Sequence, residues 1–545
     1  MTAVSRPSTA PESRPVPWQV LPPEADLPAR LSGGAGRVVP LHNRDAGSDA
    51  TRLAALVDGA LEVVVIGLYP VALLPALLAT PGRRVLVIES DPAWARWVRA
   101  SPIGRAALET QRAAIHVVGD PAVQLWRHFT TGTTPPAVLT HPVLRREWPA
   151  AVDAALAIAT RAFAGASANE QARVALAPIY LTHTLSNVAH VARSRDVSAF
   201  AGAWAGRPAV LLGAGPSLDE ALPVLRDRQD EVLVIATDTA LRPALAAGVQ
   251  PHICVAVDAS AANGRHLTDL DPPQRTWLFA EASILPAAVR AFGSRVVLFR
   301  VAEHQPWPWL SAAGVSRSTL QAWGSVLTTA FDLAVTLGAS PLLFVGADLA
   351  YTGDRPYCRG ITFERDWEAL REVGYDDDVI RRSVMRGPLI DEPDIFGQPT
   401  RTAAHLVAFR DWLVEHSAAC APGTIINATG AGILHGPGLR QVPLVDALPR
   451  GGAPIPSVGE VAQGQAARDD SPGLAAAIAD VLWGVRAHDP AADALLASWQ
   501  AFATERVSRD DLVERLSSVA IEAGFPRRAR RLDLRVSGHA TAVTP

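Results

Sequence analysis

The stretch PAVLLGAGPSLDEALPVL, residues 208–225, decides the fold. Its apolar run Ala209–Leu212 predicts a short buried strand, and the following glycine-rich residues, Gly213–Ser217, predict a tight turn. The last residue of that turn and Glu220 have the S-x-x-E spacing of a capping box, which predicts a helix from about Leu218. A glycine turn between a strand and a helix N-terminus presents backbone N–H groups and the positive end of the helix dipole. The stretch therefore predicts an anion site suited to phosphate.

Three further strand-like runs end in an acid. In IATDTA the apolar run is followed by Asp238, and in VAVDAS it is followed by Asp258. In LLFVGADLAY the apolar run leads to Asp348. In α/β sheets, ligands bind at the carboxyl ends of parallel strands, so we expect these acids beside the glycine turn. There they would hold nucleoside hydroxyls or a divalent cation. The sequence thus predicts a nucleotide-type site, and Mg²⁺ is the one cofactor it suggests, with Asp258 and Asp348 as candidate metal ligands.

The positive charge of the chain comes from arginine alone. All 50 residues counted as Lys+Arg are Arg. This composition excludes a P-loop lysine and a Schiff-base lysine. Arg355 and Arg359 follow Asp348 closely and are candidate phosphate partners, and the phenols of Tyr351 and Tyr357 in the same loop can donate to phosphate oxygens.

The N-terminal half shows a second, weaker nucleotide pattern. Residues 51–130 alternate strand-like and helical segments, and the strand predicted at Arg84–Glu89 ends in a carboxylate that would hold ribose hydroxyls in a Rossmann unit. The glycine fingerprint is defective, because Tyr69 and Pro70 stand where further glycines are needed after Gly67. The pattern resembles S-adenosylmethionine methyltransferases. The uncharged stretch from Val63 to Gly82 is long enough to cross a bilayer, but its Gly and Pro residues favour a buried strand, a turn and a short helix.

The order of these segments predicts an α/β protein with two Rossmann-like parallel-sheet units, a helical linker and a helical C-terminal tail. His183 and His190, on one face of the linker, are expected to be packed rather than metal-bound. The expected segments are a flexible leader (1–50), an N-terminal Rossmann-like domain (51–150), a helical connector (151–200), a nucleotide-binding α/β domain (201–450), a linker (451–471) and a helical C-terminal region (472–545).

Composition excludes several classes of protein. With 49% hydrophobic residues and a formal net charge of −4 over 545 residues, the chain is neither disordered throughout nor a general nucleic-acid binder. Cys254, Cys358 and Cys420 form no C-x-x-C pair, so we expect a reducing compartment and no disulfide framework. The first residues lack the apolar segment of a signal peptide. Together these features predict a cytoplasmic protein without a membrane span.

The motifs GAGPSLDE, ATDTAL, VAVDAS and FVGADLAY, in this order, resemble the domain shared by Maf-type motility accessory factors and 6-hydroxymethylpterin diphosphokinase MptE-like proteins. The resemblance covers roughly residues 200–445. It implies a cytoplasmic glycosyltransferase that moves a nonulosonic acid from a CMP-sugar to Ser or Thr of a protein such as flagellin.

The same motifs are similar to those of bacterial sialyltransferases that use a CMP-activated sugar. This resemblance implies that Tyr351 and Tyr357 are phosphate-binding tyrosines; with Asp348, which ends its own strand, they are the candidate catalytic residues. Gln398 stands where those enzymes have a general-base histidine, and glutamine cannot take a proton. Asp348, Asp391 and Asp394 are the alternative bases, unless the acceptor is activated by orientation alone. The residues implied in nucleotide binding are Gly213, Ala214, Gly215, Pro216, Ser217, Asp238, Asp258 and Ser325.

Several functions stay open at this point. The leading hypothesis is a nucleotide-sugar-dependent transferase. A diphosphokinase acting on a pterin-like alcohol with ATP and Mg²⁺ is the second, with Asp258 and Asp348 as metal ligands. A non-catalytic nucleotide-binding scaffold is the third. A methyltransferase-type activity of residues 51–150 is the last.

Overall fold

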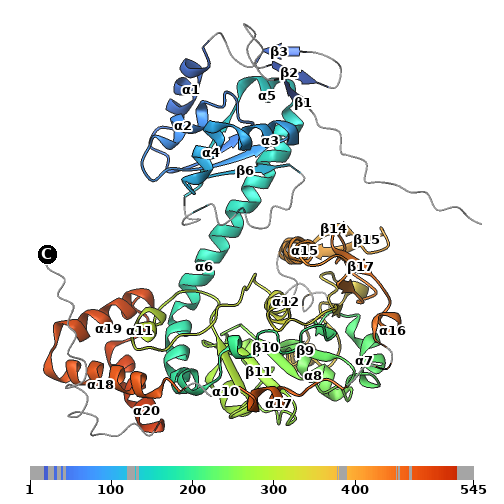
Figure 1. The fold of residues 1–545 in the computed structure, drawn as a ribbon, viewed down its shortest axis with the longest axis vertical. Helices are drawn as coiled ribbons and strands as arrows, with labels where there is room; N and C mark the ends of the chain where they lie inside the picture. The colour runs from blue at the N-terminus through green and yellow to red at the C-terminus, as the bar shows by residue number, and fades with distance from the viewer. Residues whose placement is uncertain are drawn as a thin grey trace, which may run out of the picture. The chain divides into compact units, whose positions relative to one another are not determined.

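The computed structural model describes residues 18–21, 30–33, 38–40, 45–118, 125, 129, 134–376, 379, 389–449, 451, 454–465 and 469–523. The chain divides into two compact units, residues 1–173 and 174–545. Each unit is described by itself below. Figure 1 gives the labels of the helices and strands.

Unit 1 is built on a four-stranded parallel sheet in the order β6-β5-β4-β7. When these four strands are numbered along the chain, their order in the sheet is third, second, first, fourth. The strands of a Rossmann fold begin in the same order. The elements are α1 (Ala46–Ala55), β4 (Glu62–Ile66), α2 (Leu73–Leu78), β5 (Arg84–Glu89), α3 (Pro92–Ala100), α4 (Pro102–Glu109), β6 (Ala113–Val117), β7 (Ala137–Thr140), α5 (Pro142–Glu147) and the start of α6 (Pro149–Arg193).

The uncharged stretch of unit 1 is a strand, a turn and a helix. Val63–Ile66 of β4 are almost fully buried, Gly67 turns the chain at φ +73°, and the leucines of α2 pack into the same core. This confirms the prediction from the Gly and Pro residues. None of the described helices combines the length and the apolar character that a membrane crossing requires.

A small antiparallel sheet precedes α1 within residues 1–50, for which the sequence suggested a flexible leader. Its strands are β1 (Trp18–Leu21), β2 (Arg30–Gly33) and β3 (Val38–Pro40), in the order β1-β2-β3. The strands have only three or four residues each, too few to show a clear period in the sequence.

Unit 2 is built on an eight-stranded sheet in the order β12-β11-β10-β9-β8-β13-β16-β17, and all its neighbouring strands are parallel. The strands are β8 (Ala209–Leu212), β9 (Leu233–Thr237), β10 (Ile253–Ala256), β11 (Trp277–Glu281), β12 (Val296–Phe299), β13 (Leu342–Val345), β16 (Ile425–Asn427) and β17 (Leu439–Gln441), beside a hairpin of β14 (Leu389–Pro393) and β15 (Pro399–Ala403). The helices are η2 (Val197–Phe200), α7 (Leu218–Arg226), α8 (Asp238–Ala246), α9 (Ala261–Gly264), α10 (Pro286–Phe292), α11 (Trp307–Ala312), α12 (Val326–Thr336), η3 (Thr352–Asp354), α13 (Glu364–Glu372), α15 (Ala404–Ala418), α16 (Leu444–Ala447), α17 (Val458–Gln463), α18 (Ser471–Ala487), α19 (Pro490–Phe502) and α20 (Arg509–Glu522).

The strands of unit 2 are continuous apolar runs because the sheet is covered by helices. All residues of β8, β9 and β10 are buried, and both α12 and α8 pack against β9 and β10 (Figure 1). Buried parallel strands read as unbroken apolar stretches, which is why they could be recognised in the sequence. The predicted fold class, two Rossmann-like α/β units with a helical linker (α6) and C-terminal helices (α18–α20), is confirmed.

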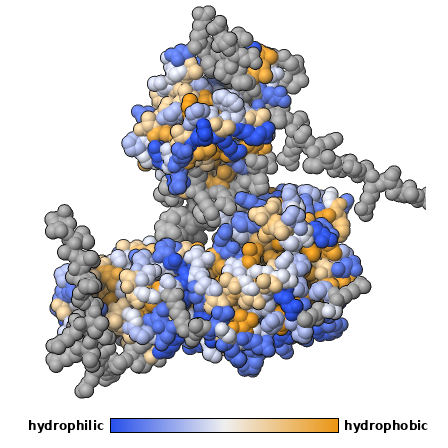
Figure 2. Space-filling model, in the orientation of Figure 1, coloured by the Kyte–Doolittle hydropathy of each residue, from blue (hydrophilic) through white to orange (hydrophobic). Residues whose placement is uncertain are grey.

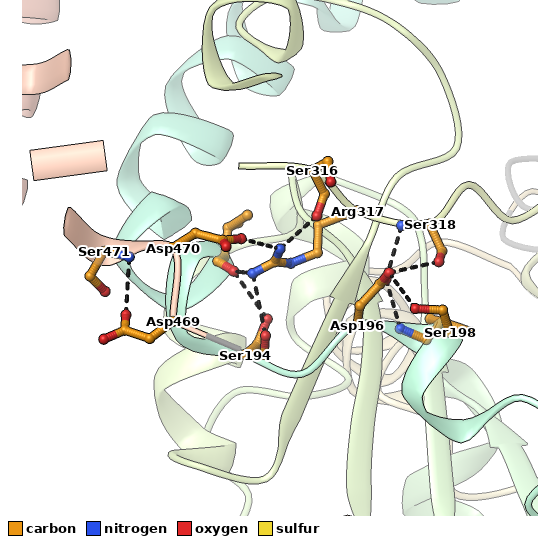
Figure 3. Close-up of polar contacts among 11 residues, drawn as sticks. Ser194, Asp196, Ser198, Ser316, Arg317, Ser318, Asp469, Asp470 and Ser471 are labelled. Atoms are coloured by element: carbon orange, nitrogen blue, oxygen red, sulfur yellow. Dashed lines mark hydrogen bonds and ion pairs between the residues drawn. The ribbon is translucent and has the colours of Figure 1, made fainter. Parts of the chain in front are cut away.

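A buried arginine joins the C-terminal helices to the rest of unit 2 (Figure 3). The side chain of Arg317 is 0% exposed, and its Nη1 lies 2.8 Å from Oδ2 of Asp470, the residue before α18. Its guanidinium also donates to the carbonyl oxygens of Val191 and Ser194, at the C-terminal end of α6. A further acceptor is the carbonyl oxygen of Ser316, the residue before the arginine. A cation on the last carbonyls of a helix is favourably placed relative to the helix dipole.

Candidate functional site

The sheet of unit 2 has its topological switch point between β8 and β13. The chain enters at β8 in the middle of the sheet, places β9 to β12 on one side, and then crosses back to place β13, β16 and β17 on the other. Open α/β sheets bind ligands at such a reversal, outside the carboxyl ends of the strands. Residues 213–217, which we call the glycine loop, and Asp348 follow these two strands and meet there.

The carboxylate of Asp348 occupies the helix N-terminus at the glycine loop. Asp348 is 1% exposed, and it accepts the Ser217 hydroxyl at 2.5 Å and the Ser217 N–H at 3.2 Å. The predicted capping box of Ser217 and Glu220 is wrong, because the Ser217 hydroxyl is committed to Asp348 and makes no cap hydrogen bond in α7. Burial raises the pKa of Asp348, while hydrogen bonds from Ser217 and Thr352 oppose the shift.

The glycines of the loop are required by close packing of backbones. A Cβ on Gly215 would lie 2.2 Å from Asp348 Oδ2 and 2.7 Å from the Gly346 carbonyl oxygen. A Cβ on Gly213 would lie 2.5 Å from that same carbonyl oxygen. The amides of Gly213 and Gly215 donate to the carbonyls of Val345 and Gly346. In this arrangement the glycine loop packs against the end of β13 and against Asp348. Phosphate binding by the amides of the loop stays a prediction.

Asp238 and Asp258 lie at the ends of the next two strands, as the spacing of the motifs predicted. Asp238 is 2% exposed and accepts from the amide of Thr239 at 2.7 Å. Asp258 accepts from the Ser260 amide at 2.7 Å and from Asn263 Nδ2 at 2.6 Å. Burial, together with the charge of Asp258, raises the pKa of Asp238 to about 7. Near neutral pH, Asp238 can therefore act as a hydrogen-bond donor as well as an acceptor.

We expect Asp238→Asn to gain stability relative to the wild type as pH rises from 4 to 8. The folded protein holds a proton on Asp238 up to about pH 7, whereas the unfolded chain loses it near the ordinary value of 3.8. The folded state therefore binds more protons within this window, so wild-type stability falls as pH rises, by about 4 kcal/mol at most. Thermal unfolding midpoints across this pH range test the expectation, with Asp227→Asn at an exposed position as control. Parallel profiles for Asp238→Asn and wild type would contradict it.

The two tyrosines of the following loop differ in exposure. Tyr351 is 6% exposed and packs with Ala403 and Leu406, below the β14–β15 hairpin, and its amide donates to the Arg401 carbonyl at 2.9 Å. Tyr357 is half-buried and packs at the edge of the core around α7. Ser325 begins α12, and its hydroxyl accepts the Leu327 amide.

The two arginines of this loop both contact Asp219 in the first turn of α7. Arg355 Nη1 lies 2.6 Å from Asp219 Oδ2, and the Arg359 amide donates to Asp219 Oδ1 at 2.9 Å. The Arg359 side chain is 83% exposed, so its guanidinium can reach a ligand more freely than that of Arg355.

Two of the three residues considered as general bases, Asp391 and Asp394, lie on the β14–β15 hairpin together with Gln398. Gln398 is exposed, and its backbone closes the turn with Asp394, whose Oδ1 accepts the amides of Phe396 and Gln398 at 2.8 Å each. Asp391 is exposed on β14, and no described residue donates to its carboxylate. The hairpin also exposes Leu389, Ile390 and Phe396, and Figure 2 shows apolar side chains among polar ones in this region.

A family model described as 6-hydroxymethylpterin diphosphokinase MptE-like matches residues 182–354. This part of unit 2 is therefore similar to MptE-like domains. The match confirms the suspected resemblance, and it includes the glycine loop, Asp238, Asp258 and Asp348. Tyr357 and the hairpin lie outside the matched range, so their roles depend on the geometry alone.

Two individual proteins are similar to this chain. An uncharacterized protein from Treponema pallidum (strain Nichols) is 30% identical over 130 residues, which are 22% of this chain and 33% of that protein. The match thus spans about a third of this curated relative. A solved structure of a Maf glycosyltransferase from Magnetospirillum magneticum AMB-1 is 16% identical, with a TM-score of 0.47, over 94% of this chain and 87% of that chain.

The range matched by the family model also holds an acid that the sequence analysis missed. Glu281 ends β11 and is 1% exposed; its Oε2 accepts the Ser283 amide at 2.5 Å, whereas no described residue hydrogen-bonds its buried Oε1. His304 Nε2 lies 3.9 Å from Oε1, and the His304 ring stacks on Tyr180. The charges of Glu281 and Asp258 add to burial in raising the pKa of Tyr180 to about 12. The sequence did contain a signal for Glu281: WLFAE is an apolar run that ends in an acid, like the runs before Asp238, Asp258 and Asp348.

The described residues do not provide a ready metal site. They contain no group of three or more His, Cys, Asp and Glu side chains that could hold a metal ion. The two acids suggested for Mg²⁺ are already hydrogen-bonded, Asp348 to Ser217 and Asp258 to Ser260 and Asn263. His183 Nδ1 hydrogen-bonds to the Ser283 carbonyl oxygen at 3.0 Å.

Glu89, the carboxylate predicted to hold ribose in unit 1, instead accepts hydrogen bonds from neighbouring groups of the protein. Glu89 is 1% exposed and accepts the Tyr69 hydroxyl at 3.0 Å, the Leu68 amide at 3.2 Å and the amides of Ser90 and Asp91. Tyr69 itself is fully buried and stacks on Trp94. Tyr69 thus stands where a dinucleotide-binding fingerprint would need a glycine, and its side chain fills the turn after β4.

Proposed function

We propose that this protein is a nucleotide-sugar-dependent glycosyltransferase, transferring a nonulosonic acid from a CMP-sugar to Ser or Thr of a protein such as flagellin. The observation that carries the proposal is the row of polar groups at the carboxyl edge of the unit 2 sheet, centred on its switch point. Such an edge is where α/β sheets bind nucleotides. The match of the MptE-like family model to these residues supports it.

In this proposal the nucleoside lies along the ends of β9 and β10. Asp238 and Asp258 hold the ribose hydroxyls, with Asp238 able to donate because burial raises its pKa to about 7. The phosphate lies towards Ser325, at the start of α12, and towards the loop of Tyr351 and Tyr357, whose hydroxyls stabilise the charge of the leaving group. Asp348 orders the glycine loop through Ser217.

The chemical step needs a proton acceptor. The acceptor hydroxyl oxygen attacks the anomeric carbon, the bond from that carbon to the phosphate oxygen breaks, and the phosphate keeps the electron pair. The hydroxyl proton must pass to a base. The carboxylate of Asp348 is hydrogen-bonded to Ser217, and that of Asp394 is hydrogen-bonded within the hairpin turn. We therefore propose Asp391 as the base, because it is exposed and no described residue donates to it.

A diphosphokinase is the second candidate, because the matching family model carries that description. It would need Mg²⁺ held by carboxylates against the phosphates. The hydrogen bonds that already occupy Asp258 and Asp348 do not fit this role, and we route no step through a metal.

Calorimetric titration with CMP, CDP, AMP and ATP, each with and without Mg²⁺, tests the proposal. We expect CMP to bind most tightly and independently of the metal. Transfer from a CMP-nonulosonic acid should then fall by about 10²-fold or more in Asp391→Asn, which removes the base, and stay unchanged in Asp446→Asn on α16. A Mg²⁺-dependent preference for ATP would favour the diphosphokinase, binding without any turnover would favour the scaffold, and no binding at all would overturn the nucleotide site.

A further inference from the structure

A cavity of about 500 Å³ lies in unit 2 and shares no lining residue with the glycine loop. Its walls come from three segments far apart in the sequence: the second half of α6, the start of α10 and the face of α20. Figure 1 shows these elements beside one another. The volume falls within the range of small-molecule sites, about 300–1,000 Å³, and suits a ligand the size of a monosaccharide.

The wall formed by α6 is fixed by hydrogen bonds to the turn after β11. Asn187 Nδ2 donates to the carbonyls of Ala282 and Ile284, at 2.9 Å each, and His183 Nδ1 lies 3.0 Å from the Ser283 carbonyl. Since that carbonyl must accept, Nδ1 carries the proton and Nε2 is free to accept a hydrogen bond. Burial, and to a lesser extent the charge of Arg515, lowers the pKa of His183, which keeps the ring neutral.

Two guanidinium groups lining the cavity are not neutralised by ion pairs among the described residues. Arg290 is exposed at the cavity, and no described residue accepts from its side chain. Arg515 donates from Nη1 to the Ser186 hydroxyl at 3.1 Å, while its buried Nε has no partner. Nε has almost no accessible surface, so Arg515 meets a ligand through the other side-chain atoms that line the cavity.

Two acids, Asp511 and Glu514, line the cavity together with the two arginines, so its formal charges balance and the cavity presents cations and carboxylates side by side. Asp511 Oδ2 is committed to the cap of α20, where it accepts the Ser508 hydroxyl at 2.8 Å. Glu514 remains as an acceptor, beside hydroxyl groups of Ser186 and Ser518 that line the same space. Carboxylates and hydroxyls of this kind bind ligand hydroxyl groups.

We propose that this cavity binds a small polyhydroxylated anion, a sugar acid or a sugar phosphate, whose charged group contacts Arg290 and Arg515. The ligand hydroxyls contact Glu514, Asp511 and His183 Nε2. This site is separate from the glycosyltransferase site proposed above, and does not depend on that function.

Calorimetric titration of the full chain with glucuronate, glucose 6-phosphate, glucose and inorganic phosphate tests the proposal. We expect glucuronate or glucose 6-phosphate to bind about tenfold or more tightly than glucose and inorganic phosphate, since neither of the latter has both the charge and the hydroxyl groups. Whichever anion binds more tightly identifies the charged group as carboxylate or phosphate.

Variants locate the binding. Arg290→Ala, at an exposed position, should weaken binding about tenfold, and Arg515→Lys, which keeps the charge but loses the planar guanidinium, should weaken it as well. Arg506→Ala, an exposed arginine outside the cavity, should change it less than about twofold. Equal binding of glucose or of inorganic phosphate, no binding of any probe at about 10 mM, or full binding by a folded Arg290→Ala variant overturns the proposal.

Discussion

Arg317→Ala is expected to release the C-terminal helices from the rest of unit 2, with a loss of about 3–5 kcal/mol in the free energy of local unfolding. The side chain is fully buried, and the substitution removes one donor from the Asp470 carboxylate and from carbonyls at the end of α6 (Figure 3). Removing one partner of a buried ion pair costs more than the pair contributes, because the remaining charge then lacks that partner in a poorly solvated place.

Hydrogen exchange measured by mass spectrometry tests this loss locally. Amides of α18, which begins one residue after Asp470, should exchange about 10²- to 10⁴-fold faster than in the wild type. Arg506→Ala removes an exposed arginine and is the matched control, with an expected change within about 0.5 kcal/mol. Unchanged exchange in α18 would mean that the other contacts of the helices hold them in place without Arg317.

The fold was predictable from the sequence because its strands are buried on both faces. AVLL, LVIAT and LLFV are unbroken apolar runs followed by glycine or acid, and each became a strand whose end lies at the carboxyl edge. Strand order was not predictable, because no local pattern says that β13 returns beside β8. The contact that defines the switch point, Ser217 with Asp348, joins residues 131 positions apart.

Local motifs misled the analysis where a distant side chain competes for the same group. The S-x-x-E spacing at Ser217 would form a capping box in an isolated helix, yet the carboxylate of Asp348 takes the hydroxyl. Likewise Glu89 has the position of a ribose ligand, but the buried Tyr69 hydroxyl binds it. Such partners cannot be read from spacing within one segment. Glu281 differs, since its apolar run ending in an acid was visible and was passed over.

Gly215→Ala is expected to weaken CMP binding by about 10²-fold or more, if the glycine loop belongs to the nucleotide site. The added Cβ would lie 2.2 Å from Asp348 Oδ2 and 2.7 Å from the Gly346 carbonyl oxygen. The carboxylate could rotate away, but the backbone carbonyl belongs to the end of β13 and cannot, so the loop must separate from that strand. Overpacking of this kind costs about 1–3 kcal/mol in stability.

Calorimetry with CMP, paired with a thermal unfolding measurement, separates the two effects. Gly459→Ala is the matched control: its Cβ would lie 3.9 Å from the nearest atom, Ser457 Oγ, within α17, where alanine is favoured over glycine by up to about 1 kcal/mol. A folded Gly215→Ala variant that binds CMP like the wild type would show that the glycines serve only to pack β8 against β13. The nucleotide would then lie along the acids of β9 to β11, where Asp238, Asp258 and Glu281 line the same edge without any help from the loop.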